Sequence, residues 1–264
     1  MTGAEYVGRL AGSRAVLALA VVEARRLVAH PLYLVLIGQL VLRAGISFSI
    51  PLAPTRDSVA ELMEVVLFYF PLISLLPANL VASSARRGHV EQALAATPVG
   101  AQARTLALGL ASLAPAALSA TGVLAYWWVA YRAGPPIDHA VPMAVMVSAP
   151  LLLVGATTLG VATAGWLRIP GAAIAVMIGL VAWTAISAQH PTGACWSPWI
   201  LAYTEAGQAA IGVSHLWHAV YLLGLSGLAM MAALLRNPEG RRALVAPTAV
   251  VVTLTALAGW AQLP

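Results

Sequence analysis

The sequence predicts an all-α fold, a bundle of transmembrane helices that forms a single membrane domain over residues 1–264. Two observations predict it. Hydrophobic residues make up 61% of the chain and charged residues only 9%, whereas a soluble domain carries roughly 25% charged residues. Apolar stretches close to the length of a membrane-crossing helix also recur along the whole chain. So few charges cannot cover a surface that faces water, so most of the surface must face lipid.

Seven stretches are long and apolar enough to be predicted as membrane spans. The first six form the expected core, and the last is predicted as a further C-terminal span. They are residues 32–50, 62–84, 104–130, 141–166, 171–188, 216–235 and 243–262. Several of these spans contain proline. Membrane helices tolerate an internal proline, which usually kinks the helix.

Residues 14–30 come before the first span and have a different pattern. One face is apolar, and the other carries Glu23, Arg25 and Arg26. His30-Pro31 ends the segment, because the residue before proline avoids the helical region. Three charges in such a short run are costly in hydrocarbon, so an amphipathic elbow helix lying in the membrane surface is favoured over an eighth, poorly formed span.

The arginines predict how the bundle is oriented. With a cytoplasmic N-terminus, eleven of the fourteen arginines fall on the cytoplasmic side, and only Arg56 and Arg132 fall outside, with Arg43 inside a span. The positive-inside rule therefore favours this orientation, which puts the C-terminus outside after a seventh span. The same distribution accounts for the isoelectric point of about 9.9 as a topology signal, so we expect no binding to nucleic acid.

Two connections between spans are unusual. Residues 85–98 are short, cytoplasmic and helix-like, and end at Thr97-Pro98. Residues 189–215 lie on the external side and are too apolar for a free loop but too interrupted by proline and glycine for a clean span. We expect a broken, re-entrant segment there, with an ordinary long external loop as the alternative.

The order of these elements, together with two stretches of sequence, resembles the membrane subunit of a type-2, exporter-type ABC transporter. One stretch is EARRLVAHPLYL at 23–34, similar to that family's elbow helix. The other is ARRGHVEQALAATPVGAQARTLALGLA at 85–111, similar to its coupling segment. The matching positions there are Arg87, Gly88, Glu91, Leu94, Thr97 and Pro98. The family core has six spans and a cytoplasmic C-terminus, so residues 243–262 depart from the family pattern.

The resemblance implies a permease in the bacterial plasma membrane that moves its substrate by ATP hydrolysis on a separate ABC ATPase subunit. That partner would hold ATP and Mg, while this chain would bind no cofactor and would not be an enzyme. A second permease, the same or a related one, would complete the substrate path. The residues independently require such a partner, because a chain without lysine cannot form a Walker A loop.

A short coupling helix at 85–98 would transmit the motion of the ATPase. Arg86, Arg87 and Glu91 would offer charged contacts, and Val90 and Leu94 are spaced i and i+4, so they would offer one apolar edge. The full predicted coupling set is Arg86, Arg87, Gly88, Val90, Glu91, Leu94, Thr97 and Pro98. A solvated loop with an incidental helix is the alternative.

Arg43 lies past the middle of the first span, where burying an arginine costs roughly 2.5–3.5 kcal/mol. Glu64 enters the second span from the same side at a similar depth, so we expect an intramembrane Arg43–Glu64 pair, with Glu61 as the second choice of partner. Snorkelling of Arg43 to the headgroups and a contact with substrate are the alternatives.

The chain carries no pattern of an enzyme active site. His215 and His218 are spaced i, i+3 on the external side, near His190 and Cys195, but no carboxylate completes a metal site. HExxH and GxSxG are both absent from the sequence. We therefore predict no catalytic, cofactor or metal residues. A non-transporting membrane scaffold or accessory subunit is the alternative function. A secondary transporter is weaker, because no array of intramembrane charges suggests ion coupling.

Small residues recur in the fourth span, at Gly155, Gly160, Ala164 and Gly165. They permit close approach of another helix. The sequence leaves open whether that helix belongs to the same subunit or to a second copy.

Overall fold

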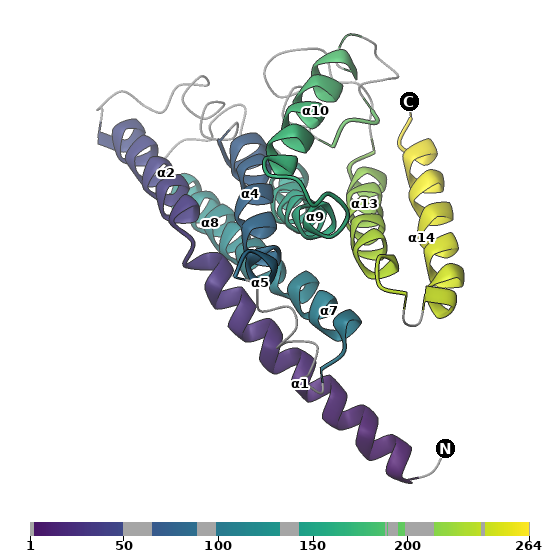
Figure 1. The fold of residues 1–264 in the computed structure, drawn as a ribbon. Helices are drawn as coiled ribbons and strands as arrows, with labels where there is room; N and C mark the ends of the chain where they lie inside the picture. Colours follow the sequence, from purple (N-terminus) through teal and green to yellow (C-terminus); the bar gives the residue numbers. More distant parts are fainter. Residues whose placement is uncertain are drawn as a thin grey trace.

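A computed structural model describes most of the chain, namely residues 3–49, 65–88, 99–132, 143–187, 189, 195–198, 214–238 and 241–263. Every regular element within these residues is a helix, so the all-α prediction is confirmed (Figure 1). The helices are α1 (Gly3–Val28), α2 (Pro31–Ser49), the π-helical turn η1 (Val65–Tyr69), α4 (Phe70–Ala82), α5 (Ser84–Arg87), α7 (Ala101–Ala111), α8 (Leu113–Arg132), α9 (Met143–Trp166), α10 (Ala172–Ser187), α13 (His215–Leu235) and α14 (Arg241–Ala261).

Five of the described helical segments are long and apolar enough to cross a membrane. They are Val65–Ala82, Ala101–Ala125, Val147–Trp166, His215–Leu235 and Arg241–Ala261. The chain is therefore a multi-pass membrane protein. The last of these segments shows that the predicted C-terminal span forms an apolar helix of sufficient length. The helices α2, with 19 residues, and α10, with 16, cover the first and fifth predicted spans and are not among the five.

The predicted span at 104–130 is two consecutive helices, α7 and α8, separated by a turn at Ser112. Pro115 explains the break, because it has no N–H to bond the carbonyl of Ala111 one turn earlier. The Ser112 hydroxyl donates to the carbonyl oxygen of Gly109 at 2.6 Å and so satisfies a helix-end acceptor. Proline also accounts for the irregular turn before α4. Pro71 is the second residue of α4, and the π-helical turn η1 ends just before that helix begins.

The helix α9 lies at the centre of the bundle, between α4 and α13. A side chain at Gly160 would come within 2.5 Å of the carbonyl oxygen of Leu75 on α4, and one at Gly155 would meet the Ser226 hydroxyl on α13. Asn79 of α4 also donates to the Gly160 carbonyl at 3.3 Å. These small residues therefore serve packing within the subunit, which settles the alternative that the sequence left open.

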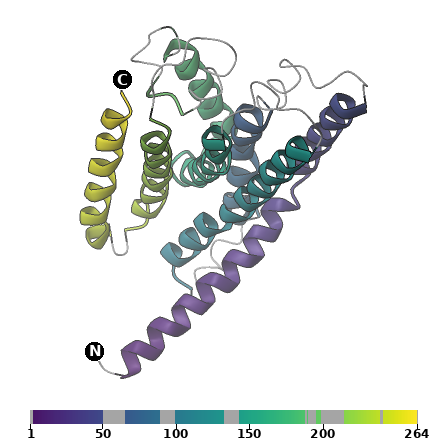
Figure 2. The same ribbon diagram turned by 180° about the vertical axis from the view of Figure 1, so that it is seen from behind.

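The N-terminal part forms a second layer beside this core. Figures 1 and 2 show α1 and α2 following each other in one direction, with α7 and α8 alongside them, while α13 and α14 pack together on the other side of α9. The helix α1 begins at Gly3 and is longer than the predicted elbow at 14–30. The predicted break is confirmed, since α1 ends at Val28 and α2 begins at Pro31.

Candidate functional site

The region of interest is the end of the bundle where α4 finishes and the predicted coupling segment begins. The short helix α5 carries Arg86 and Arg87 in its only turn. Arg86 donates to the carbonyl oxygen of Ala164 at 3.0 Å, near the C-terminal end of α9. Arg87 donates to the carbonyl oxygen of Leu80 on α4. Both guanidinium groups thus cap backbone carbonyls at helix C-termini, where a positive charge is favourable.

Gly88 closes this turn. Its N–H bonds the carbonyl of Ser84 at 2.9 Å, and its backbone stays at a negative φ of −82°. The remaining residues of the predicted coupling set, Val90, Glu91, Leu94, Thr97 and Pro98, lie outside the described residues, and their roles stay predictions. The chain is described again from Val99, whose carbonyl accepts a hydrogen bond from Arg104 at 3.0 Å.

One of the predicted elbow residues, Arg26, contacts α5 directly. Arg26 of α1 binds both carboxylate oxygens of Glu23 at 3.0 Å and also donates to the Ser84 hydroxyl at 3.1 Å. Glu23 is nearly buried, whereas Arg26 is half exposed and Arg25 is exposed. The ion pair lies within α1 and is partly screened by water, so it adds little stability by itself. The hydrogen bond from Arg26 to Ser84 is what joins α1 to α5.

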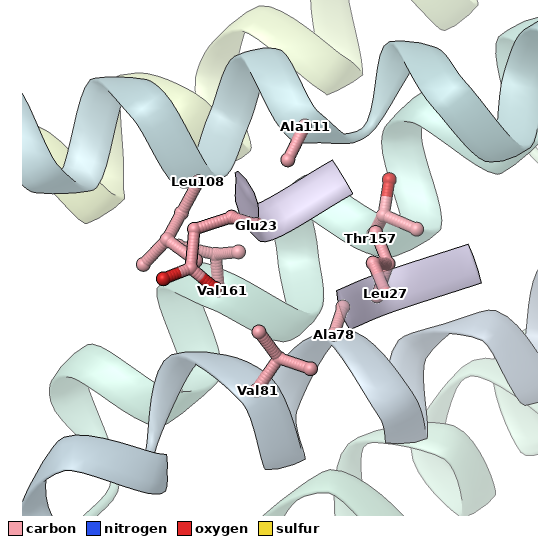
Figure 3. Close-up of a pocket in the computed structure, with 8 residues that line it drawn as sticks. All are labelled: Glu23, Leu27, Ala78, Val81, Leu108, Ala111, Thr157 and Val161. Carbon is pink, nitrogen blue, oxygen red and sulfur yellow. The ribbon is translucent and has the colours of Figure 1, made fainter. Parts of the chain in front are cut away.

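Glu23 also lines a small crevice between four helices (Figure 3). The other lining residues come from α1, α4, α7 and α9 and are apolar except for one threonine; they are Leu27, Ala78, Val81, Leu108, Ala111, Thr157 and Val161. The Thr157 hydroxyl is already bonded to the Leu153 carbonyl at 2.6 Å. Because Arg26 neutralises Glu23, the crevice holds no uncompensated charge among these lining groups.

Two further side chains connect helix ends in the same region. The indole N–H of Trp166, the last residue of α9, donates to the Ala232 carbonyl of α13 at 2.8 Å. Asn237, just beyond α13, donates to the Thr105 hydroxyl of α7 at 3.3 Å. Together with Arg86 they link the ends of α4 and α5, α9, α13 and α7. We refer to Arg86, Trp166 and Asn237 as the end clasp.

The break between α1 and α2 lies next to α5. The Nδ1 atom of His30 accepts the N–H of Leu32 at 3.3 Å, so the imidazole caps α2 ahead of Pro31. Burial, and then the nearby positive charge of Arg87, lower the pKa of His30 below its ordinary value. Both effects favour the neutral ring, which is the form that accepts this hydrogen bond.

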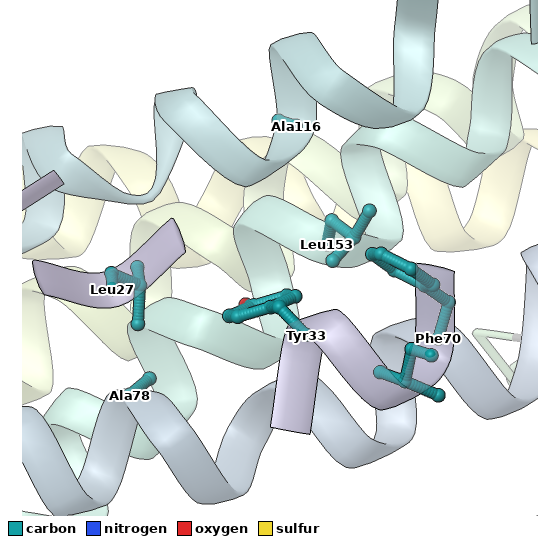
Figure 4. Close-up of a cluster of buried hydrophobic side chains, with 7 residues drawn as sticks. Leu27, Tyr33, Phe70, Ala78, Ala116 and Leu153 are labelled. Carbon is teal, nitrogen blue, oxygen red and sulfur yellow. The ribbon is translucent and has the colours of Figure 1, made fainter. Parts of the chain in front are cut away.

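A compact apolar cluster supports this break from inside the bundle (Figure 4). The rings of Tyr33 on α2 and Phe70 on α4 lie 5.7 Å apart and are tilted by 49°. The other members come from α1, α2, α4, α8 and α9 and are Leu27, Leu36, Ala78, Ala116 and Leu153. The cluster therefore fixes the direction in which α2 leaves α1.

The predicted intramembrane pair is only partly described. The backbone of Arg43 is part of α2, its side chain is not described, and both Glu64 and Glu61 lie outside the described residues. The Arg43–Glu64 pair therefore stays a prediction. Among the described residues, no group of three or more histidine, cysteine, aspartate or glutamate side chains has the arrangement of a metal site.

A second polar cluster lies at the opposite end of the bundle. His218 of α13 and Gln262, directly after α14, are both fully buried, and the His218 Nδ1 and Gln262 Oε1 atoms lie 2.8 Å apart. Four described residues of the predicted re-entrant segment, 195–198, pack against them. The sequence had placed His218 and Cys195 on the same external side, and Gln262 is the one amide in an otherwise apolar C-terminal stretch; their contact was not predicted.

Comparison of the chain with protein-family models, with curated proteins and with solved structures finds no match.

Proposed function

We propose that this chain is the permease subunit of an ATP-driven exporter of the type-2 ABC class. It would couple to a separate ATPase through residues 85–98 and share the substrate path with a second permease, the same or a related chain. The observation that supports this most is the hydrogen bond from Arg26 to Ser84, because it joins the N-terminal helix to the residue directly before the coupling segment.

The hydrogen bonds at this end give a route for force. A displacement of 85–98 would act on α5, then through Arg86 on the Ala164 carbonyl of α9. From there the Trp166 indole reaches the Ala232 carbonyl of α13. Helices are stiff along their axes, so motion at their linked ends is carried through the bundle as rigid tilting. A coupling segment needs this property, whereas a solvated loop does not.

The charges at this end agree with a cytoplasmic location. Arginines gather where α4 ends, where α7 begins, and around the α9–α10 and α13–α14 connections; they are Arg86, Arg87, Arg104, Arg168, Arg236, Arg241 and Arg242. By the positive-inside rule this end faces the cytoplasm, where ATP is available, and the N-terminus is cytoplasmic. The protein would then lie in a bacterial plasma membrane with its C-terminus outside.

The lateral surface suits both lipid and a second permease. Large apolar side chains are exposed along α2, α10 and α14, and Val35, Ile178 and Trp260 are examples that are each more than half exposed. Exposed apolar residues of this kind are stable in lipid and leave helix faces available for a neighbouring membrane subunit.

The test is a charge reversal in the coupling segment, Glu91→Arg with Leu94→Asp. The tagged chain is purified from its native membranes after gentle solubilisation, and Mg-dependent ATP hydrolysis and a Walker-motif protein are measured in the eluate. We expect the ATP hydrolysis and the amount of Walker-motif protein in the eluate to fall tenfold or more in the double variant. Losing a buried contact between charged or apolar groups typically weakens an interface by that factor.

Glu205→Arg is the matched control, because it reverses a charge in the segment that the sequence places on the opposite side of the membrane. It should leave the co-purified ATPase unchanged. Retention of the ATPase and of ATP-dependent transport by the double variant contradicts the coupling assignment. Absence of any Walker-motif protein from the wild-type eluate instead favours the scaffold function, and transport that persists without ATP favours a secondary transporter.

A further inference from the structure

The second polar cluster lies where three segments meet at the C-terminal end of the bundle. Residues 195–198 pack against the first turn of α13 and the last turn of α14. The contacts are buried, because His218, Gln262 and Cys195 each have 0% of their surface exposed. Polar groups so far from water must satisfy one another, which makes their donor and acceptor roles deducible.

Gln262 fixes the first of these roles. Its Nε2 atom lies 2.6 Å from the carbonyl oxygen of Cys195. A carbonyl oxygen only accepts, so the amide nitrogen must be the atom that faces it. The Oε1 atom then faces His218 Nδ1 at 2.8 Å. Because the amide oxygen is also only an acceptor, His218 Nδ1 must carry a hydrogen.

The second ring nitrogen of His218 meets another acceptor. Its Nε2 atom lies 3.3 Å from the carbonyl oxygen of Pro198. A neutral imidazole has one N–H, and Nδ1 already uses it, so the Nε2 lone pair of a neutral ring faces the lone pairs of an oxygen. Only the imidazolium donates to Gln262 and Pro198 together. The arrangement therefore has one hydrogen bond fewer whenever the ring is neutral.

Within the part of the chain that the structure describes, few other ionisable groups lie near this ring. His215 lies one turn earlier on α13 and is exposed. Tyr221, one turn later, has its ring centroid 6.2 Å from that of His218. The 195–198 segment contributes the Cys195 thiol, and α14 contributes only the uncharged Gln262. Glu23, whose carboxylate is the one that the structure describes, belongs to α1. The groups described next to the His218 ring nitrogens are thus the oxygen atoms of Gln262 and Pro198.

Residues 195–198 contact three of the described helices, α10, α13 and α14. Tyr221 donates to the Trp196 carbonyl at 3.0 Å, and the two rings meet edge to face at 6.0 Å. The Trp196 ring lies so close to α14 that a side chain at Gly259 would come within 2.5 Å of it. Ser197 lies within 3.5 Å of the Thr184 hydroxyl on α10. Loss of the hydrogen bond between His218 and Pro198 would therefore loosen the packing of α10, α13 and α14 around residues 195–198.

We propose that His218 is a proton-operated latch, in which the protonated ring ties residues 195–198 to α13 and α14 and the neutral ring releases the contact with Pro198. The latch is a property of this chain alone and does not depend on the proposed transport function. Acid closes it and alkali loosens it.

Cys195 provides a reporter, because it is the only cysteine of the chain and is buried inside the latch. The purified full-length protein in detergent is labelled with N-ethylmaleimide at pH values from 5.5 to 8.5. At each pH the labelling rate is divided by the rate for the unfolded protein, which removes the titration of the thiol itself. We expect the corrected rate to rise about tenfold towards alkaline pH, the factor typical of losing one charge-assisted hydrogen bond.

His218→Gln removes the titratable group and should abolish this rise, whereas the matched variant His215→Gln, on the exposed histidine of the same helix, should retain it. Gln262→Glu places a carboxylate beside the ring and should move the midpoint to higher pH; it carries the test alone where His218→Gln does not fold. A corrected rate that is flat with pH in the wild type, a rise that persists in His218→Gln, or an unmoved midpoint in Gln262→Glu would each overturn the proposal.

Discussion

The two ends of the bundle hold their helices together by different chemistry. At the end with the coupling segment, charged or long side chains such as Arg86 and Trp166 donate to backbone carbonyls, and much of this region is exposed. At the C-terminal end, His218 and Gln262 are fully buried and form a connected polar chain to Cys195 and Pro198. The end with the coupling segment is held by separate hydrogen bonds that water could replace. The C-terminal end is held by a few buried hydrogen bonds that share the same side chains.

This difference has an energetic meaning. An exposed donor that loses its partner is solvated by water, so the loss is small. A buried donor or acceptor without a partner keeps its full desolvation cost. The coupling-segment end is therefore suited to exchange its contacts for those of a partner subunit, while the C-terminal end is suited to two discrete states.

The largest effect should come from Gln262→Leu, which removes the centre of the buried chain. The His218 N–H and the Cys195 carbonyl would both lose their hydrogen bond to Gln262 in an apolar setting, and we expect a loss of about 2 kcal/mol in stability. The measurement is the thermal unfolding midpoint in detergent. Gln189→Leu, which changes the same residue type at an exposed site, should leave the midpoint within experimental error, and an equal loss there would mean that burial is not the cause.

A smaller effect is expected from Arg86→Met at the coupling-segment end. The change keeps an unbranched apolar stem but removes the guanidinium and its hydrogen bond to the Ala164 carbonyl, and it should cost about 1 kcal/mol. Arg242→Met, an exposed arginine at the start of α14, is the control in the same unfolding assay. If both variants lose the same stability, the effect is one of general charge rather than of the end clasp.

The smallest expected effect is the pH dependence of stability that His30 contributes, which should have the opposite direction to that of His218. The pKa of His30 in the folded protein lies below its ordinary value of 6.5, so the folded state binds fewer protons than the unfolded state between these two values. The stability that the neutral ring contributes is complete above pH 6.5 and is lost as the pH falls through the folded pKa. Acid should thus weaken the cap of α2 while it closes the His218 latch.

His30→Asn tests the cap, because asparagine caps a helix without titrating. The difference in unfolding midpoint between wild type and this variant should shift in favour of the variant on going from pH 7.5 to pH 5. A difference that is constant with pH would show that the His30 ring does not titrate in a way linked to folding.

The sequence located much of the candidate site but not what its residues bind. It placed Arg86 and Arg87 at the start of a cytoplasmic helix and Glu23, Arg25 and Arg26 on the helix before the first span. It expected the arginines of α5 to face an ATPase, and the structure adds their hydrogen bonds to the Ala164 and Leu80 carbonyls within the chain. Backbone acceptors leave no trace in the sequence, so these partners were not predictable.

The sequence by itself determined the properties that depend on local composition. Hydropathy predicted a helical membrane protein, and Pro31 predicted where α1 ends. The positions of the arginines predicted which connections between helices lie at the same end of the bundle. Only the tertiary structure decided that Gly160 packs against α4 and that His218 meets Gln262 across 44 positions of sequence. The physical reason is that hydropathy reports how each residue meets lipid or water, whereas contacts between helices depend on the rotation and depth of each helix, which are fixed only when all of them pack together.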